Sequence, residues 1–298
     1  MGFSKDVELQ RTPVQLKELK NIKKVKCGAN FCLALDDKGA VYAWGSGQQC
    51  ELGRKLVERS AINGLIPSTF GLKKTKKEYI VDISCGANHA FAIDNNDNIW
   101  AWGSNNMGQT GIMDNAGEGE GAVIEVPTKV EALSRDALQS KIVKLDGGNL
   151  HSIAVTEDGK CRTWGRVDGG ACGVDIASLP KEKLIYNERE EPKILKEPTA
   201  VLPGILLSPP STFIITTIAD TLSELQFASA AAGPGHSVMI TKEGKAYSCG
   251  LNNNFQLGQG IDGEDVMVAT IMRGSQITDA IKFTSVDCAE TMFLCTEA

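Results

Sequence analysis

The sequence has few of the side chains on which most enzymes and metal proteins depend. It contains three histidines in 298 residues, and its nine cysteines include no Cys-x-x-Cys spacing. Zinc sites need clustered ligands, and Ser-His-Asp centres need a histidine that is free to act as a base. The sequence therefore predicts no metal site, no cofactor and no enzyme that makes or breaks covalent bonds.

Long apolar runs are also missing. No such run reaches 18 residues, so no membrane-spanning helix and no membrane partner are expected. The start of the chain, MGFSKD, lacks the apolar core of a secretory signal. The absence of closely spaced cysteines favours a reducing compartment, the nucleus or the cytoplasm. We interpret Cys27, Cys85 and Cys288, which share one position of the pattern described below, as small buried residues on packed strands.

A strong excess of positive charge is absent too. The net charge is −6, which argues against direct sequence-specific binding of nucleic acid. The basic cluster at 73–77 is interpreted as part of a solvated loop, with a phosphate or acidic-protein contact as the alternative.

Glycine, in contrast, is abundant and periodic. There are 31 glycines, and a frame of fixed length recurs at 27–53, 85–111, 147–173 and 232–258. The frame contains an opening glycine, a ring three residues later, a Trp-Gly pair and a closing glycine. The residues at the first three of these positions are Gly28, Gly86, Gly148 and Gly233; Phe31, His89, His151 and His236; and Trp44, Trp102, Trp164 and Cys249. A fixed internal frame indicates a repeat architecture.

Each frame predicts a β-hairpin, and the spacers supply further strands. Four short antiparallel strands in roughly 60 residues are typical of a propeller blade, which needs neighbours to bury both of its faces. We interpret the histidines as structural residues that hydrogen-bond to a neighbouring strand, and the tryptophans as core residues between blades.

The pattern divides the chain into one domain, 1–298, made of successive units. The expected units are the tail of an incomplete blade at 1–19, repeats at 22–77, 78–137, 141–222 and 226–279, and a half repeat at 281–298. Four further expectations follow: a strand at 12–16, a short helix at 54–59, a long insertion at 174–222 and, within it, a surface loop at 186–198. The role of 203–222 is left open.

The units resemble the regulator of chromosome condensation repeat family. The resemblance depends on the G-x-x-H corner, the A-W-G segment and the closing L-G, and it covers the chain apart from 203–222. The spacer at 48–59 is similar to that of the fungal nuclear members that serve as guanine-nucleotide exchange factors for the small GTPase Ran. The resemblance implies a seven-bladed propeller, present here as an incomplete arc of about four to five blades that lacks its N-terminal part. An open arc is expected rather than one closed by 1–19.

The resemblance also implies a function. One propeller face would bind a Ran-type GTPase and promote GDP release, which supports nuclear transport and chromatin-linked production of Ran-GTP. Arg166, Asn106 and Asn30 match family positions and are the candidate GTPase contacts, although the family has Asp where this chain has Asn30. Leu150 departs from a family histidine.

Other expectations rest on the same family. The wedge that acts on the GTPase would lie before Met1, so weak exchange is expected. The expected location is the nucleus, with the cytoplasm as the alternative, and histone or chromatin contacts rest on analogy alone. The competing hypothesis is a propeller scaffold that binds proteins without exchange activity.

Overall fold

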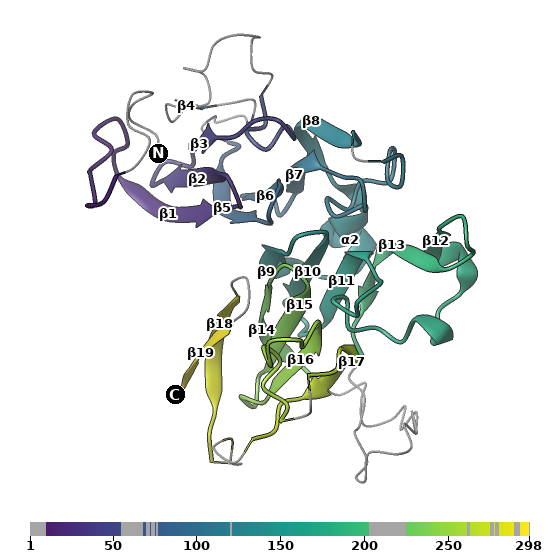
Figure 1. Cartoon of the computed structure of the whole chain (residues 1–298). Coiled ribbons are helices and arrows are strands. Elements are labelled where there is room, and N and C mark those ends of the chain that lie inside the picture. Colours follow the sequence, from purple (N-terminus) through teal and green to yellow (C-terminus); the bar gives the residue numbers. More distant parts are fainter. Residues whose placement is uncertain are drawn as a thin grey trace.

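The computed structural model describes residues 10–54, 68–69, 72, 75, 77–119, 121–202, 225–260, 263–274, 277, 280–288 and 293–297. These residues form successive antiparallel sheets arranged as an arc (Figure 1). The protein is therefore an all-β propeller arc, as predicted.

Three sheets have four strands joined in sequence order. The first sheet consists of β1 (Ile22–Cys27), β2 (Phe31–Asp36), β3 (Val41–Gly45) and β4 (Ser68–Thr69). The second consists of β5 (Ile80–Cys85), β6 (His89–Asp94), β7 (Ile99–Ser104) and β8 (Val123–Lys129). The fourth consists of β14 (Phe227–Ala232), β15 (His236–Thr241), β16 (Ala246–Gly250) and β17 (Val266–Ile271). Each of these sheets is one blade.

The third and last sheets depart from this plan. The third has five strands: β9 (Ile142–Gly147), β10 (His151–Thr156), β11 (Cys161–Arg166), β13 (Pro192–Ala200) and, outermost, β12 (Leu184–Tyr186). The last is the two-stranded ribbon of β18 (Phe283–Cys288) and β19 (Phe293–Glu297), which packs against β14 and β15. The short helical elements are η1 (Glu131–Leu133), α2 (Arg135–Leu138), η2 (Ile176–Ser178) and η3 (Lys181–Lys183).

Two local expectations are wrong. The segment 186–198 is not a surface loop, because β12 and β13 form a hairpin whose turn is closed by a hydrogen bond from Asn187 N–H to the Glu191 carbonyl. Of its charged residues, those at 188–191 lie in the turn of this hairpin, and Lys193, Lys196 and Glu197 lie on β13. The segment 12–16 is not a strand. The expected helix at 54–59 and the segment 203–222 lie outside the described residues, apart from Arg54.

Steric constraints explain why a glycine follows the tryptophan position in each frame. Gly103 has φ +99°, and a Cβ at this position would lie 2.5 Å from the Asn88 carbonyl oxygen. The same oxygen accepts a hydrogen bond from Ser104 N–H at 2.7 Å. The left-handed backbone and the close approach both require glycine. Gly45, Gly165 and Gly250 have the same conformation and contact.

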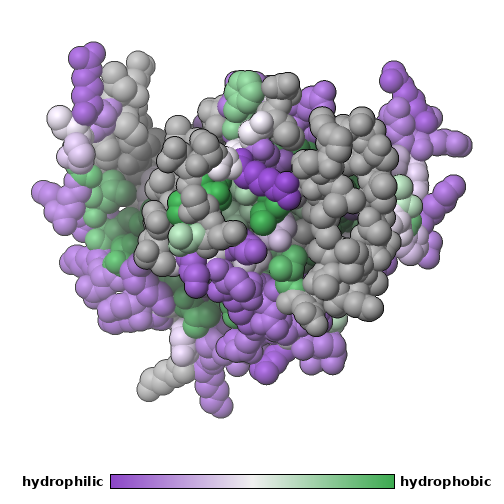
Figure 2. All heavy atoms as spheres, turned by 90° about the horizontal axis from the view of Figure 1, so that it is seen from below, coloured by the Kyte–Doolittle hydropathy of each residue, from purple (hydrophilic) through white to green (hydrophobic). Residues whose placement is uncertain are grey.

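The hydrophobic core lies between the blades. Between the first two blades, Leu33 and Leu35 of β2 pack with Ile83, Ala90 and Trp102 of the second sheet. Similar clusters fill the next two interfaces, and a smaller one lies between the fourth blade and the ribbon. From below Figure 1, the described surface is mostly hydrophilic, with smaller hydrophobic areas between (Figure 2). No described helix is long and apolar enough to cross a membrane.

Two of the three tryptophans of the frame join their own blade to the one before it. The Trp102 indole N–H donates to the Glu51 carbonyl at 2.8 Å, and the Trp164 indole N–H donates to the Gln109 carbonyl at 3.0 Å. Both side chains are fully buried. Trp44, in the first blade, is 7% exposed, and the described residues provide no equivalent carbonyl for it.

This difference yields a matched pair of variants. Trp102→Phe removes a buried hydrogen bond and leaves the Glu51 carbonyl without its donor, so it should lower the free energy of unfolding by about 2 kcal/mol. Trp44→Phe makes the same change in shape without that loss and should cost about half as much. Urea denaturation followed by circular dichroism measures both. Equal costs would contradict the role of the indole bond between blades.

Candidate binding face

The four opening glycines have equivalent surroundings. In the second blade, Gly86 N–H donates to the His89 carbonyl at 2.9 Å. A Cβ at Gly86 would lie 2.0 Å from His89 Cε1 and 2.6 Å from the carbonyl oxygen of Gly148 in the next blade. The ring therefore lies over its glycine, and the adjacent blade closes the remaining space. Gly28, Gly148 and Gly233 repeat this contact with Phe31, His151 and His236.

The first interfacial histidine has a defined hydrogen-bond direction. His89 Nε2 lies 2.9 Å from Ser152 Oγ, and the Ser152 hydroxyl donates to the Gln109 carbonyl at 2.8 Å. Because a serine hydroxyl carries one proton, Ser152 must accept from His89, which places the imidazole proton on Nε2. The Trp164 indole donates to the same Gln109 carbonyl. One carbonyl thus joins a tryptophan and a histidine–serine pair across a single interface.

The other interfaces vary this arrangement. His151 Nε2 lies 2.8 Å from Ser237 Oγ, whose hydroxyl donates to the Ala171 carbonyl at 2.8 Å. Between the first two blades, Phe31 takes the histidine position and Ala90 takes the serine position, so the pair is apolar. Among the described residues, neither ring nitrogen of His236 finds a hydrogen-bond partner.

The turns of these corners all lie at the same end of the blades. We define the loop face as the turns 28–31, 86–89, 148–151 and 233–236, together with the loops that follow the Trp-Gly pairs. Asn30, Asn88, Leu150 and Gly235 each precede the ring residue on this face, and their carbonyls hold the start of the adjoining loop. The turns are also bonded between blades: Ala29 N–H donates to Ala87 O, and Ala87 N–H donates to Gly148 O, both at 2.9 Å.

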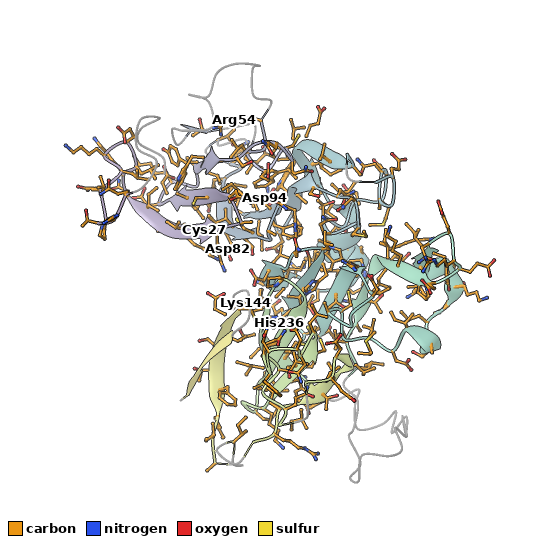
Figure 3. All side chains as sticks on the ribbon, in the orientation of Figure 1. Cys27, Arg54, Asp82, Asp94, Lys144 and His236 are labelled. Carbon is orange, nitrogen blue, oxygen red and sulfur yellow. The ribbon has the colours of Figure 1, made fainter. Side chains whose placement is uncertain are left out.

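A pocket of about 510 Å³ lies where the first strands of the blades converge. Its wall combines the glycine corners with three charged residues, Lys26, Asp146 and Asp287. Cys27 also lines it and is exposed, and Cys288 is half-buried, so the expectation of a buried thiol is wrong for these two but right for Cys85. Cys85 is covered by the preceding blade, whereas no described blade precedes Cys27. In Figure 3, Cys27 lies on the inner side of the first blade and Arg54 at its outer part.

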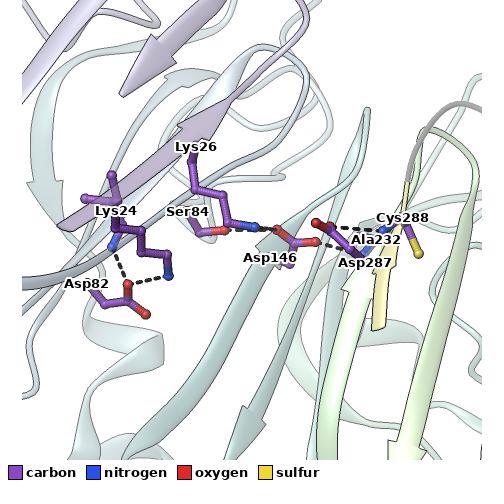
Figure 4. A network of polar contacts seen from close by, with 9 residues as sticks. Lys24, Lys26, Asp82, Ser84, Asp146, Ala232, Asp287 and Cys288 are labelled. Carbon is purple, nitrogen blue, oxygen red and sulfur yellow. Dashed lines mark hydrogen bonds and ion pairs between the residues drawn. The ribbon is translucent and has the colours of Figure 1, made fainter. Parts of the chain in front are cut away.

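Asp146 is the centre of a polar network that joins four blades (Figure 4). One carboxylate oxygen accepts from the Ser84 hydroxyl at 3.0 Å and lies 3.7 Å from Lys26 Nζ. The other accepts from Ala232 N–H at 3.1 Å. Lys24 forms an ion pair with Asp82 beside this network.

Burial and charge act in opposite directions within the network. Burial raises the pKa of Asp146, and the Lys26 charge and the hydrogen bonds of Ala232 and Ser84 offset this only in part. Burial lowers the pKa of Lys26, but the nearby negative charges, with Asp146 the largest, raise it overall. Because removing one partner of such a pair leaves an uncompensated buried charge, Asp146 constrains how the blades sit together.

The three candidate GTPase contacts all lie on the loop face, but they differ in exposure and in hydrogen bonding. Arg166 is exposed and donates two 2.5 Å hydrogen bonds to Asp168, which raise the pKa of Arg166 and lower that of Asp168. Asn106 is half-buried, and its side-chain oxygen accepts from the Gln109 amide at 3.0 Å. The Asn30 side chain is exposed. The structure thus places Asn106 as a support for its own loop and leaves Arg166 and Asn30 accessible.

Sequence reasoning missed the charged residues of the first strands. A signal was present: at one position of the frame the blades carry Lys24, Asp82 and Lys144, so opposite charges follow one another from blade to blade. Asp168 was missed because it lies in a loop after the frame's Trp-Gly pair. Among the described residues, no group of three or more His, Cys, Asp or Glu side chains is placed to hold a metal ion.

Comparison with known proteins identifies the family. The model of the RCC1-like domain matches residues 1–295. The chain belongs to the RCC1-like family. This RCC1-like chain is 34% identical over 279 residues to protein pim1 of Schizosaccharomyces pombe, covering 94% of the chain and 46% of pim1. It is 30% identical over 282 residues to the guanine nucleotide exchange factor SRM1 of Saccharomyces cerevisiae, covering 94% of the chain and 52% of SRM1.

A solved structure shares the fold. The crystal structure of Prp20p from Saccharomyces cerevisiae superimposes with a TM-score of 0.81 and 28% identity, covering 100% of this chain and 61% of Prp20p. That structure was described together with the binding of Prp20p to Gsp1p and histones. The predicted resemblance to fungal exchange factors is confirmed. The chain spans about half the length of the curated relatives it matches.

The buried histidines predict how stability depends on pH. Burial lowers the pKa of both His89 and His151 to about 3 from the ordinary 6.5. The folded state therefore binds fewer protons than the unfolded state between these values. Stability should be complete above pH 6.5 and fall below it, by roughly 1 kcal/mol per pH unit for each histidine.

The first interface provides the control for this prediction. The double variant His89→Phe with Ser152→Ala copies the Phe31–Ala90 pair. It should reduce the slope of unfolding free energy against pH between 6.5 and 5, as measured by urea denaturation. If the double variant kept the slope of the unmodified chain, the assignment of that slope to His89 would be wrong.

The Asp146 network predicts a graded loss of stability. Asp146→Ala removes the partner of Lys26 and the acceptor for Ser84 and Ala232, and should cost about 3 kcal/mol. Asp146→Asn keeps one acceptor oxygen and should cost clearly less. Thermal unfolding of the two variants side by side tests this, and equal midpoints would count against the network.

Proposed function

We propose that this RCC1-like chain binds a small GTPase of the Ran type through its loop face and promotes release of GDP. The observation that carries the proposal is its similarity, over 94% of its length, to the guanine nucleotide exchange factor SRM1. The fold match with Prp20p, described with its binding to Gsp1p, supports partner binding by this fold.

Exchange of this kind makes no covalent bond. A protein that binds the nucleotide-free GTPase tightly must weaken nucleotide binding by the same factor, because the two equilibria are linked. Loosening a nucleotide about 10⁵-fold requires roughly 7 kcal/mol of coupling. Such coupling needs a surface that does not yield when the partner binds. The backbone bonds from Ala29 to Ala87 and from Ala87 to Gly148 hold the loop face in this way.

Arg166 is the side chain on this face that best suits a polar partner. Its bidentate bond with Asp168 fixes the guanidinium plane, while 44% of the side chain remains exposed. An arginine held in this way loses less freedom on binding than a mobile one. Asn30 is the second contact with the GTPase. Asn106 contributes indirectly, by stabilising the conformation of its own loop.

The same relatives support a cellular setting. Prp20p was described with binding to histones, so we infer a nuclear location and a chromatin partner for this chain. The role that corresponds to this location is production of Ran-GTP near chromatin, which supports nuclear transport.

Release of labelled GDP from Ran is the direct test of this function. Adding the chain in catalytic amounts should accelerate release, and the chain should retain nucleotide-free Ran in preference to GDP-bound Ran. The half-buried Leu150, which offers no polar group where the family resemblance implies one, favours a scaffold as the second candidate. Binding without preference for the nucleotide-free form would support the scaffold, and no binding to either form would overturn the proposal.

Arg166 provides a variant that separates binding from folding. Arg166→Ala should weaken binding to nucleotide-free Ran about tenfold, or roughly 1.4 kcal/mol, with an unchanged unfolding midpoint because exposed ion pairs add little stability. Arg135→Ala is the matched control, since Arg135 is also an exposed arginine, 3.5 Å from Asp97 at the opposite end of the blades. Equal binding by the two variants would remove Arg166 from the interface.

A further inference from the structure

Two cysteines face each other on the first blade. Cys27 ends β1, Cys32 lies near the start of β2, and their sulfur atoms are 3.4 Å apart. Cys27 is exposed and Cys32 is half-buried. The pair flanks the turn of the first opening glycine, so it lies at the loop face and beside the central pocket.

The fold does not require this pair. The register that aligns Cys27 with Cys32 aligns different residues in the other sheets. The equivalent pairs are Cys85 with Ala90, Gly147 with Ser152, Ala232 with Ser237, and Cys288 with Phe293. In the second blade a single cysteine therefore fills the same corner. The second thiol of the first blade is an addition to the frame.

The backbone geometry suits a bond between the two sulfurs. Gly28 N–H donates to the Phe31 carbonyl at 2.9 Å, so the next pair outward, Cys27 and Cys32, is one that exchanges no backbone hydrogen bonds. Such pairs have Cα atoms on the order of 4.5 Å apart, which lies within the range of disulfides. Closing the bond brings the two sulfur atoms from 3.4 Å to about 2 Å.

The two thiols are chemically unequal. The hydrogen bond from Cys32 and the charge of Lys26 lower the pKa of Cys27 to about 6, although burial acts against them. The same hydrogen bond and burial raise the pKa of Cys32. The shared hydrogen bond thus favours a single thiolate in the pair, and the Lys26 charge lies beside Cys27. This is the division of roles found in a nucleophile and its resolving partner.

We propose that Cys27 and Cys32 form a redox-active dithiol that reacts with hydroperoxides and closes to an intramolecular disulfide. In the first step the Cys27 thiolate attacks one peroxide oxygen, the O–O bond breaks, and the other oxygen leaves as water after taking a proton. Cys27 becomes a sulfenic acid. In the second step the Cys32 sulfur attacks Cys27, the S–O bond breaks, and the Cys32 proton leaves with the hydroxide as water. Two thiols and hydrogen peroxide thus give one disulfide and two waters.

The expected advantage in rate can be stated. Lowering a thiol pKa from 9 to about 6 raises the thiolate fraction at pH 7 about a hundredfold, while the lower basicity reduces nucleophilicity. The two effects leave Cys27 about fivefold more reactive than an ordinary exposed thiol. Cys85 is buried and has a raised pKa, so it should react far more slowly.

Mass spectrometry tests the proposal on the full chain. After treatment with hydrogen peroxide and alkylation of the remaining thiols, trypsin should release residues 27–38 as one peptide containing both cysteines. The expected result is that this peptide lacks two hydrogens and carries no alkyl group, whereas the peptide containing Cys85 is fully alkylated. Incubation with a dithiol reductant should restore alkylation at both cysteines.

Cys32→Ala is the matched variant, because it copies the Cys85–Ala90 pair of the second blade. In this variant Cys27 should stop at the sulfenic acid, which a dimedone probe traps, and no disulfide should form. The same treatment in urea should abolish the fivefold advantage of Cys27. Alkylation of the 27–38 peptide at the same rate as in the denatured chain, or oxidation of Cys85 as fast as Cys27, would overturn the proposal. None of these measurements involves a GTPase, so they are independent of the proposed function.

Discussion

Each blade meets the next through a backbone contact that leaves no space for a Cβ atom. At each opening glycine, a ring of the same blade lies on one side, and between successive blades the carbonyl of the next opening glycine closes the other. The contact fixes the spacing of the blades at their inner edge, and the hydrophobic clusters then fill the wider space outside it. Because each repeat contacts only its neighbours, the same contact at three successive interfaces sets a similar spacing at the inner edge of each.

The polar groups follow from the same constraint. A histidine held over its glycine points its Nε2 at the neighbouring blade, where Ser152 or Ser237 accepts its proton. The first strands converge at the centre, so charged side chains on them are brought close enough to pair across blades. Asp146 contacts three other blades for this reason, although its partners are far apart in sequence.

Much of the architecture could be predicted because glycine, ring and tryptophan positions recur at a fixed spacing. The charged network could not be predicted in this way, because the residues that form it differ in type and in charge from blade to blade. They become neighbours only in the folded arc, where the first strands converge. Cys27 was assigned to the core by analogy with Cys85, but burial at that position depends on a preceding blade. The charge of the segment 186–198 favours a loop, but the charged residues lie in the hairpin turn and on β13, where they do not prevent β12 and β13 from pairing. Arg166 could be predicted because it matches a family position. Asp168, its hydrogen-bond partner, matches no such position.

The side chains that meet at the first interface differ from those at the next two, although the backbone contact does not. Phe31 meets Ala90, His89 meets Ser152, and His151 meets Ser237. Replacing the first blade by a second copy of the second blade would set an imidazole against the Ala90 methyl group, and a buried donor would lose its acceptor. The apolar pair therefore acts as a key that separates the first interface from the two His–Ser interfaces that follow it.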